Sequence, residues 1–191
     1  MERLMDKVAA WEGLKGNAIV KRACEVALAG HHTLTVIGHP QNGEALLRLV
    51  MEDLLTFVRP CSCGWYGDRL FPCLCSVLAI SRYRRSRRFA KALSSDVVVE
   101  LVRPGPDDYR DGEPFARVLE RIEHIGELPR QWTASAQDLL QRAISRLPLT
   151  LERVGQVNRV AGTIAALGGC QMVEIHHCAE AIQYSRPISS I

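Results

Sequence analysis

The chain lacks the segments that would place it in a membrane or export it. None of its apolar runs approaches the roughly 20 residues that a membrane-spanning helix needs. The stretch from Met1 to Lys7 mixes charges and has no apolar segment of the kind found in secretory signals. Low-complexity segments and internal repeats are missing as well. We therefore expect a cytoplasmic globular protein that makes no membrane contact.

Acidic residues are missing from one basic stretch. The formal net charge of +3 is too small to indicate nucleic-acid binding by itself. The sequence RYRRSRRFAK, however, has no acid and six cations, namely Arg82, Arg84, Arg85, Arg87, Arg88 and Lys91. Such a run predicts a cationic patch that binds nucleic acid without reading its sequence, with only Tyr83 and Phe89 available to stack on bases. The plainer alternative is a solvated helix face, or arginines that neutralise nearby thiolates.

The first half has the pattern of an α/β fold. Helical periodicity covers residues 17–29 and returns over residues 43–53. The apolar face of the first helix would consist of Ile19, Val20, Ala23, Val26 and Ala27. Runs rich in β-branched or apolar residues predict three strands, over residues 33–37, 55–58 and 97–102. The Pro104-Gly105-Pro106 stretch that follows is the best candidate linker.

The second half predicts helices alone. Amphipathic periodicity covers residues 115–125, 134–147, 151–167 and 173–184. Ser or Thr caps and the Gly168-Gly169 pair separate these segments. We therefore expect an α/β domain over residues 1–106 and a helical bundle over residues 107–191 that packs on one side of the sheet.

Four of the seven cysteines fall within one short stretch. Cys61, Cys63, Cys73 and Cys75 form a C-x-C-x9-C-x-C pattern with a glycine-containing turn between the pairs. A structural zinc site needs four thiolates around one ion, and two hairpin-like pairs can supply them. Four free thiols or a redox pair are the alternatives, but the neighbouring Ser, Gly and Pro residues are untypical of a core. Cys24, Cys170 and Cys178 fit core packing.

A damaged phosphate-binding loop follows the first predicted strand. A P-loop has two glycines with four residues between them, then a lysine for the phosphates and a hydroxyl for magnesium. Gly38 and Gly43 keep that spacing, whereas Glu44 replaces the lysine and Ala45 replaces the hydroxyl. A carboxylate repels a polyphosphate, and a methyl group cannot hold a cation. The loop therefore predicts feeble nucleotide binding at best.

Three blocks of the chain resemble the magnesium-chelatase-like (ComM/YifB-type) AAA+ ATPases. KGNAIVKRACEVALAGHHTLTVIGHP resembles the entry helix, first strand and P-loop of that family. RPCSCGWYGDRLFPCLCSVLAISRYRRSRR resembles its cysteine-rich insert and the basic stretch after it. LERVGQVNRVAGTIAALGG, followed by AEAIQY, resembles its C-terminal helical lid. The resemblance extends over most of the chain.

The departures from the family imply a lost activity. The long segment that in the family holds the acidic Walker B residues is reduced to a brief connection. Arg59 stands where the family has a polar Asn, and residues 93–96 replace the segment with the arginine finger. The sensor arginine of the lid falls on Glu152. We therefore expect no ATP hydrolysis and neither ATP nor Mg²⁺ as a cofactor, since several parts of phosphoryl-transfer chemistry are missing together.

The resemblance also implies an architecture. Family sheets have the strand order 5-1-4-3-2, and the reduced segment would contain strands two and three. The three predicted strands then correspond to strands one, four and five, which are neighbours in that sheet. We expect a trimmed AAA+ core with a small parallel sheet, a zinc insert over about residues 59–80, an all-helical lid, and an open edge along residues 55–58.

Three functions remain open at this point. The first is an inactive pseudo-ATPase that binds another protein, such as a family ATPase or a DNA-processing complex. The second is sequence-nonspecific nucleic-acid binding by the run from Arg82 to Lys91. The third is a nucleotide sensor without hydrolysis, against which Glu44 argues. Homo-oligomerisation is left open, and the histidines offer no spacing that suggests an enzyme.

Overall fold

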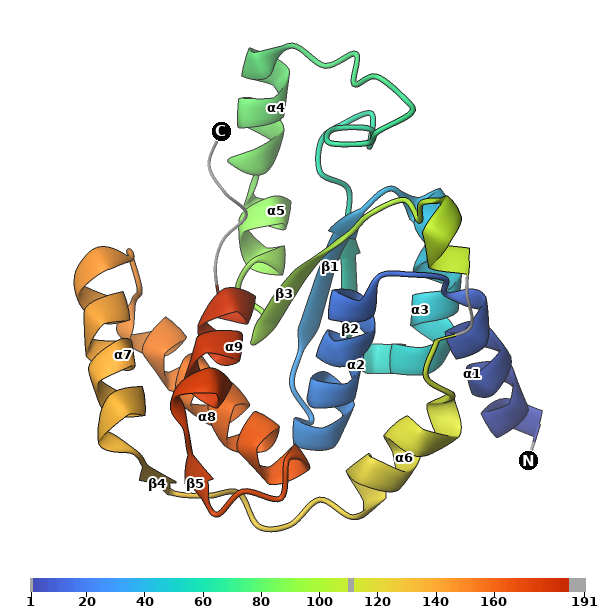
Figure 1. Ribbon diagram of the computed structural model, residues 1–191. Coiled ribbons are helices and arrows are strands. Elements are labelled where there is room, and N and C mark those ends of the chain that lie inside the picture. Colours follow the sequence, from blue (N-terminus) through green and yellow to red (C-terminus); the bar gives the residue numbers. More distant parts are fainter. Residues whose placement is uncertain (1, 110–111, 186–191) are drawn as a thin grey trace.

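A computed structural model of the chain describes residues 2–109 and 112–185 (Figure 1). The fold is mixed α/β, with a small central sheet and helices on both of its faces. Among the described helices, none has the length and apolar character needed to span a bilayer.

The central sheet contains β1 (Leu34–Gly38), β2 (Leu55–Val58) and β3 (Val97–Leu101), all parallel and in the order β2-β1-β3. The three predicted strands are thus confirmed, as is the predicted neighbour relationship, in which the first strand lies between the other two. Every residue of β1 is buried because this strand has a neighbour on each side and helices over each face. β2 and β3 form the edges of this sheet.

Five α-helices accompany the strands in the first half: α1 (Glu2–Gly13), α2 (Ala18–Gly30), α3 (Glu44–Met51), α4 (Val77–Arg84) and α5 (Arg87–Ala92). Short 3₁₀ turns occur at Pro40–Asn42, Glu52–Leu54 and Pro106–Tyr109. The predicted apolar face of α2 is correct for Val20, Ala23, Val26 and Ala27. It is wrong for Ile19, which is 69% exposed because this side chain lies in the first turn, beyond the edge of the core.

The second half contains α6 (Phe115–Glu123), α7 (Ala134–Arg146), α8 (Leu151–Leu167) and α9 (Ile175–Ser185). The hydroxyls of Thr133 and Thr150 cap α7 and α8 by accepting a backbone N–H. An all-helical region was expected, and this is incorrect. β4 (Gln131–Trp132) and β5 (Met172–Val173) form a two-stranded parallel sheet, because the segments that lead into α7 and α9 lie side by side.

Two apolar clusters hold the sheet between its helices. The larger lies on the face covered by α2, α8 and α9 and extends in sequence from Ala10 to Tyr184. The smaller lies on the other face, where Phe89 and Ala92 of α5 pack on Ile37, Val58 and Val98. Because the larger cluster includes residues from both halves, the division at residue 106 remains a prediction. Its C-terminal limit at residue 191 lies outside the described residues.

Candidate metal centre and degenerate phosphate loop

The four clustered cysteines converge on one point. Their sulfur atoms all lie within 4.8 Å of one another. Cys61 Sγ is 3.4 Å from Cys63 Sγ and 3.7 Å from Cys73 Sγ, and the sulfurs of Cys63 and Cys73 are 3.6 Å apart. A tetrahedral zinc ion with Zn–S bonds of about 2.3 Å would separate its ligands by about 3.8 Å. The donor set and its spacing therefore fit a metal ion such as zinc.

The local chain explains how two C-x-C pairs meet. Gly64 and Gly67 have φ angles of 89° and 83°, in a region that other residues rarely adopt, and they allow the chain to reverse between the pairs. The N–H of Gly64 donates to Cys61 Sγ at 3.2 Å, and Ser62 Oγ lies 3.1 Å from Cys75 Sγ. Ser76 then caps α4, so this helix begins directly after the last cysteine.

The thiols differ in acidity. Burial raises the pKa of Cys73 to about 12. Burial also opposes ionisation of Cys63, but hydrogen bonds from the Trp65 N–H and the Cys61 thiol outweigh it and lower the pKa to about 6. Such a difference is expected where several thiols share a small volume, because one thiolate disfavours the next.

The loop that resembles a phosphate-binding loop connects β1 to α3. Gly38 has to be glycine because a Cβ there would lie 2.7 Å from the carbonyl oxygen of Leu101 in the neighbouring strand. Gly43 has a φ of 136° and precedes the first residue of α3. Glu44 turns along the helix and pairs with Arg48 at 2.6 Å, while Ala45 is exposed. The two glycines thus serve the turn and the strand packing, and Glu44 places a carboxylate in the first turn of α3.

The cysteine segment folds back over this loop. The ring of His39 stacks on the ring of Trp65 with centroids 3.4 Å apart. Asp68 accepts backbone hydrogen bonds from Leu70 and Phe71 and pairs with Arg103 at 3.2 Å. The Arg103 guanidinium lies 5.5 Å from the centroid of Trp65 and 4.9 Å from that of Phe71. The loop after β1, the cysteine segment and the chain after β3 therefore form one connected surface.

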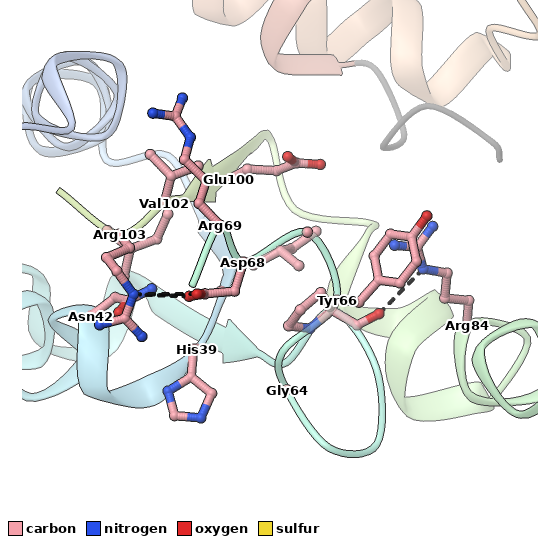
Figure 2. Close-up of a pocket in the computed structure, with 15 residues that line it drawn as sticks. His39, Asn42, Gly64, Tyr66, Asp68, Arg69, Arg84, Glu100, Val102 and Arg103 are labelled. Carbon is pink, nitrogen blue, oxygen red and sulfur yellow. Dashed lines mark hydrogen bonds and ion pairs between the residues drawn. The ribbon is translucent and has the colours of Figure 1, made fainter. Parts of the chain in front are cut away.

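A cavity of about 280 Å³ lies where these three segments meet, at the carboxyl ends of β1 and β3. Figure 2 shows Asp68 and Arg103 joined across it, with His39 and Asn42 close by. Burial opposes ionisation of Asp68, but the N–H groups of Phe71 and Leu70 and the Arg103 guanidinium hold its pKa below the usual range. Glu100 also lines the cavity, so its walls carry both signs of charge.

The basic run is not one helix. It breaks between α4 and α5 at Ser86, whose hydroxyl accepts the N–H of Phe89 and starts the second helix. Arg84 is engaged in the fold, since its Nε donates to the carbonyl of Pro60 and its guanidinium lies over Tyr66. The expectation that Phe89 could stack on bases is wrong, because Phe89 is only 3% exposed and packs against Tyr83. The five remaining cations of the run are exposed, namely Arg82, Arg85, Arg87, Arg88 and Lys91.

Two residues matched to family motifs lie away from the loop after β1. Asp96 caps the start of β1 by accepting from the N–H of Thr33 at 3.1 Å and pairs with Arg159 of α8. Glu152 is exposed in the first turn of α8. Its neighbour Arg153 donates to the carbonyls of Leu93 and Ser95, just before β3. This part of α8 therefore lies at the amino end of the parallel sheet, opposite the loop.

Reasoning from sequence missed the side chains that join the cysteine segment to the loop. His39, Trp65, Asp68 and Arg103 are separated by up to 64 positions, and no short motif links them. The only available signal was the single carboxylate between Glu52–Asp53 and Asp96, which is Asp68. Fourteen neutral or basic residues separate Asp68 from Asp53, and 27 separate it from Asp96, and an acid isolated in this way suggests an ion pair.

The fold and site define a parallel α/β core with a P-loop-like turn, a cysteine cluster and a helical C-terminal region. The profile described as magnesium chelatase, subunit ChlI, matches residues 10–59, and that described as magnesium chelatase, subunit ChlI C-terminal, matches residues 120–185. The chain belongs to the magnesium-chelatase-like family. Its small parallel sheet is consistent with a trimmed AAA+-like core. No curated protein matched the chain.

Proposed function

We propose that the chain is a catalytically inactive, zinc-containing member of its family that acts by binding another protein. The observation behind this proposal is that the cysteine segment lies over the loop between β1 and α3, which is equivalent to a phosphate-binding loop. The Trp65 ring lies on His39, and Glu44 stands in the lysine position with its carboxylate paired to Arg48. A triphosphate would have to displace the cysteine segment and would then meet a carboxylate in place of an ammonium group.

Calorimetric titration with ATP and Mg²⁺ tests the first half of the proposal. We expect no heat of binding and no release of phosphate, because Glu44 repels the ligand and Ala45 cannot hold the metal ion. Micromolar affinity without hydrolysis would favour the nucleotide-sensor alternative. Turnover of ATP would overturn the pseudo-ATPase proposal.

Affinity capture with the full chain tests the second half. Zinc held by Cys61, Cys63, Cys73 and Cys75 would fix the shape of the insert, and the helical lid would complete the module. We expect a specific protein to be recovered from the native host by the wild-type chain and by Cys170→Ser, and to be lost with Cys73→Ser. A partner such as a family ATPase or a DNA-processing protein fits the proposal. Recovery of no specific protein would contradict it.

Direct nucleic-acid binding is the second candidate. Residues 69–95 contain seven cations and no acid, so an anionic partner is attracted to this segment. The exposed cations lie on two short helices, which fits an electrostatic contact without base readout.

A further inference from the structure

The outer edge of β2 is accessible along its length. Among the described residues β2 pairs only with β1, so one side of its backbone has no strand partner. A groove of about 480 Å³ follows this edge and is lined by all four residues of the strand. Parallel sheets are normally covered on their faces and finish at protected edges, and an open edge is a template for another strand.

The walls of the groove have one sign of charge. Arg88 and Lys91 of α5 line one side, and Arg48 of α3, which is paired with Glu44, lies on the other. No acidic residue is among the lining side chains. Arg88 and Lys91 are exposed and form no ion pair with any described residue. The rest of the lining is apolar or carries hydroxyls: Thr33, Leu55, Thr56, Phe57, Val58, Ala92, Ser94 and Ser95.

We propose that this groove binds an extended acidic segment of a partner protein, which adds a fourth strand beside β2. Backbone hydrogen bonds to the free edge supply affinity, and carboxylates facing Arg88 and Lys91 supply selectivity. Val58 and Ala92 on the α5 side offer apolar contact to the alternate side chains of the segment. The inference rests on the proposed protein-binding role and names the chemistry of the partner.

The positive charge of the groove favours an acidic partner segment over a second copy of the chain and over the chain's own C-terminal residues. A second copy of the chain would bring the same cations to the edge, and like charges across a strand pair are unfavourable. Residues 186–191 of the chain itself (RPISSI) include a proline and no acid, so they do not match the groove in composition. Cations beside an edge also deter self-pairing, which is compatible with a site reserved for an acidic strand.

Selection from a displayed library of random twelve-residue peptides, with the full chain as bait, tests the proposal. We expect enriched peptides to alternate Asp or Glu with Val, Ile or Thr and to lack a central proline. In the Arg88→Glu/Lys91→Glu variant the affinity of the best peptide should fall at least about tenfold. Arg130→Glu/Arg146→Glu is the matched control: it makes the same charge change at exposed positions outside the groove and should leave the affinity unchanged.

Hydrogen exchange supplies the second readout. The bound peptide should slow exchange at amides within Leu55–Val58, which a contact through side chains alone would not do. The proposal is overturned if no acidic peptide is enriched, if binding survives the groove variant, or if β2 amides stay unprotected. Self-association that the groove variant abolishes would assign the edge to a second copy, and an oligonucleotide that displaces the peptide at lower concentration would assign it to nucleic acid. If a host protein is captured but binds the groove variant equally well, the proposed function stands and this inference fails.

Discussion

At the scale of single residues, His32 shows how one buried group ties two elements together. It follows α2, lies within the protein, and its Nε2 is 2.8 Å from Oγ1 of Thr163 in α8. Gly30 is next to this pair, and a Cβ there would lie 2.2 Å from the imidazole. Burial lowers the pKa of His32, with Asp96 acting to raise it and with Arg159 and His31 acting to lower it.

His32 makes stability depend on pH below neutrality. A lowered pKa means that the unfolded chain takes up a proton first, so the free energy of unfolding should decrease as the pH falls from about 6.5 towards the folded-state pKa. Melting temperatures at pH 7.5 and 5.5 should therefore differ less in His32→Gln than in the wild type. His124→Asn is the control, because His124 is exposed at the end of α6 and is not one of the groups that shift the pKa of His32. An unchanged pH dependence in His32→Gln would exclude this role.

Arg153 provides a second prediction at this scale. Its guanidinium satisfies the carbonyls of Leu93 and Ser95, which follow α5, and Gln156 donates to Ser94 at 2.9 Å. Arg153→Met removes the charged donor and should lower the free energy of unfolding by about 1–3 kcal/mol in urea titrations. Arg146→Met, at an exposed position of α7, should change it by no more than about 0.5 kcal/mol. Equal effects of the two substitutions would show that the α8 contact contributes little.

At the scale of elements, the cysteine cluster positions α4. The helix begins at Val77, two residues after Cys75, and Arg84 near its end donates to the carbonyl of Pro60, which precedes Cys61. Figure 1 shows α4 extending beyond the sheet together with the loop before it, so this helix has few contacts with the main body. A metal ion bound by the four cysteines would thus join the start of the cysteine segment, at Cys61 and Cys63, to its end at Cys73 and Cys75, directly before α4.

Metal analysis tests the role of the cluster. Purified protein should contain about one zinc per chain, and chelation should lower the melting temperature because a structural metal contributes to folding. Cys73→Ser should lose the metal, whereas Cys170→Ser should retain it, since Cys170 lies outside the cluster. Metal-free protein that melts at the same temperature with and without chelator would rule out a structural zinc.

At the scale of the whole molecule, charge is distributed unevenly. Residues 69–95 have a formal charge of +7, so the remainder of the chain, with 17 cations and 21 acids, has −4. Long-range attraction would orient an anionic partner towards α4 and α5. The same attraction is weak at high salt, which makes ionic strength the natural variable for a test.

Nucleic-acid binding by the run from Arg82 to Lys91 should be weakly sequence-dependent and steeply salt-sensitive. Each neutralised phosphate contributes about −0.9 to the slope of log affinity against log salt on duplex DNA. An Arg82→Ala/Arg85→Ala/Arg87→Ala/Arg88→Ala variant should bind more weakly with a shallower slope. Arg84 is left intact because it holds Pro60 and Tyr66. If the parent chain binds no nucleic acid at low salt, direct nucleic-acid binding is excluded and the protein-binding proposal stands alone.

The sequence was a good guide where structure depends on neighbours in the chain. Runs such as VVVELV predict strands by composition, and the spacing of Cys61, Cys63, Cys73 and Cys75 predicts their convergence. The strand order followed from the family resemblance. The break at Ser86 was also accessible in principle, since a serine that begins a helix within a basic run is a capping signal.

Contacts between distant segments were beyond such reasoning. The stacking of Trp65 on His39 and the pairing of Asp68 with Arg103 depend on how the cysteine segment folds over the sheet, which no periodicity encodes. β4 and β5 have two residues each, too few to show an alternating pattern. Their pairing accompanies the contact between α7 and α9, which the sequence does not reveal.

The position of β1 between its neighbours has a consequence for synthesis on the ribosome. Leu34 pairs with Leu55, which emerges 21 residues later, and with Val97, which emerges 63 residues later. Closing the longer loop costs about 1 kcal/mol more in chain entropy than closing the shorter one. The nascent chain should therefore form the β1–β2 pair first and expose one side of β1 until β3 leaves the exit tunnel. During that interval the cysteine segment is already outside, so metal uptake can precede completion of the sheet.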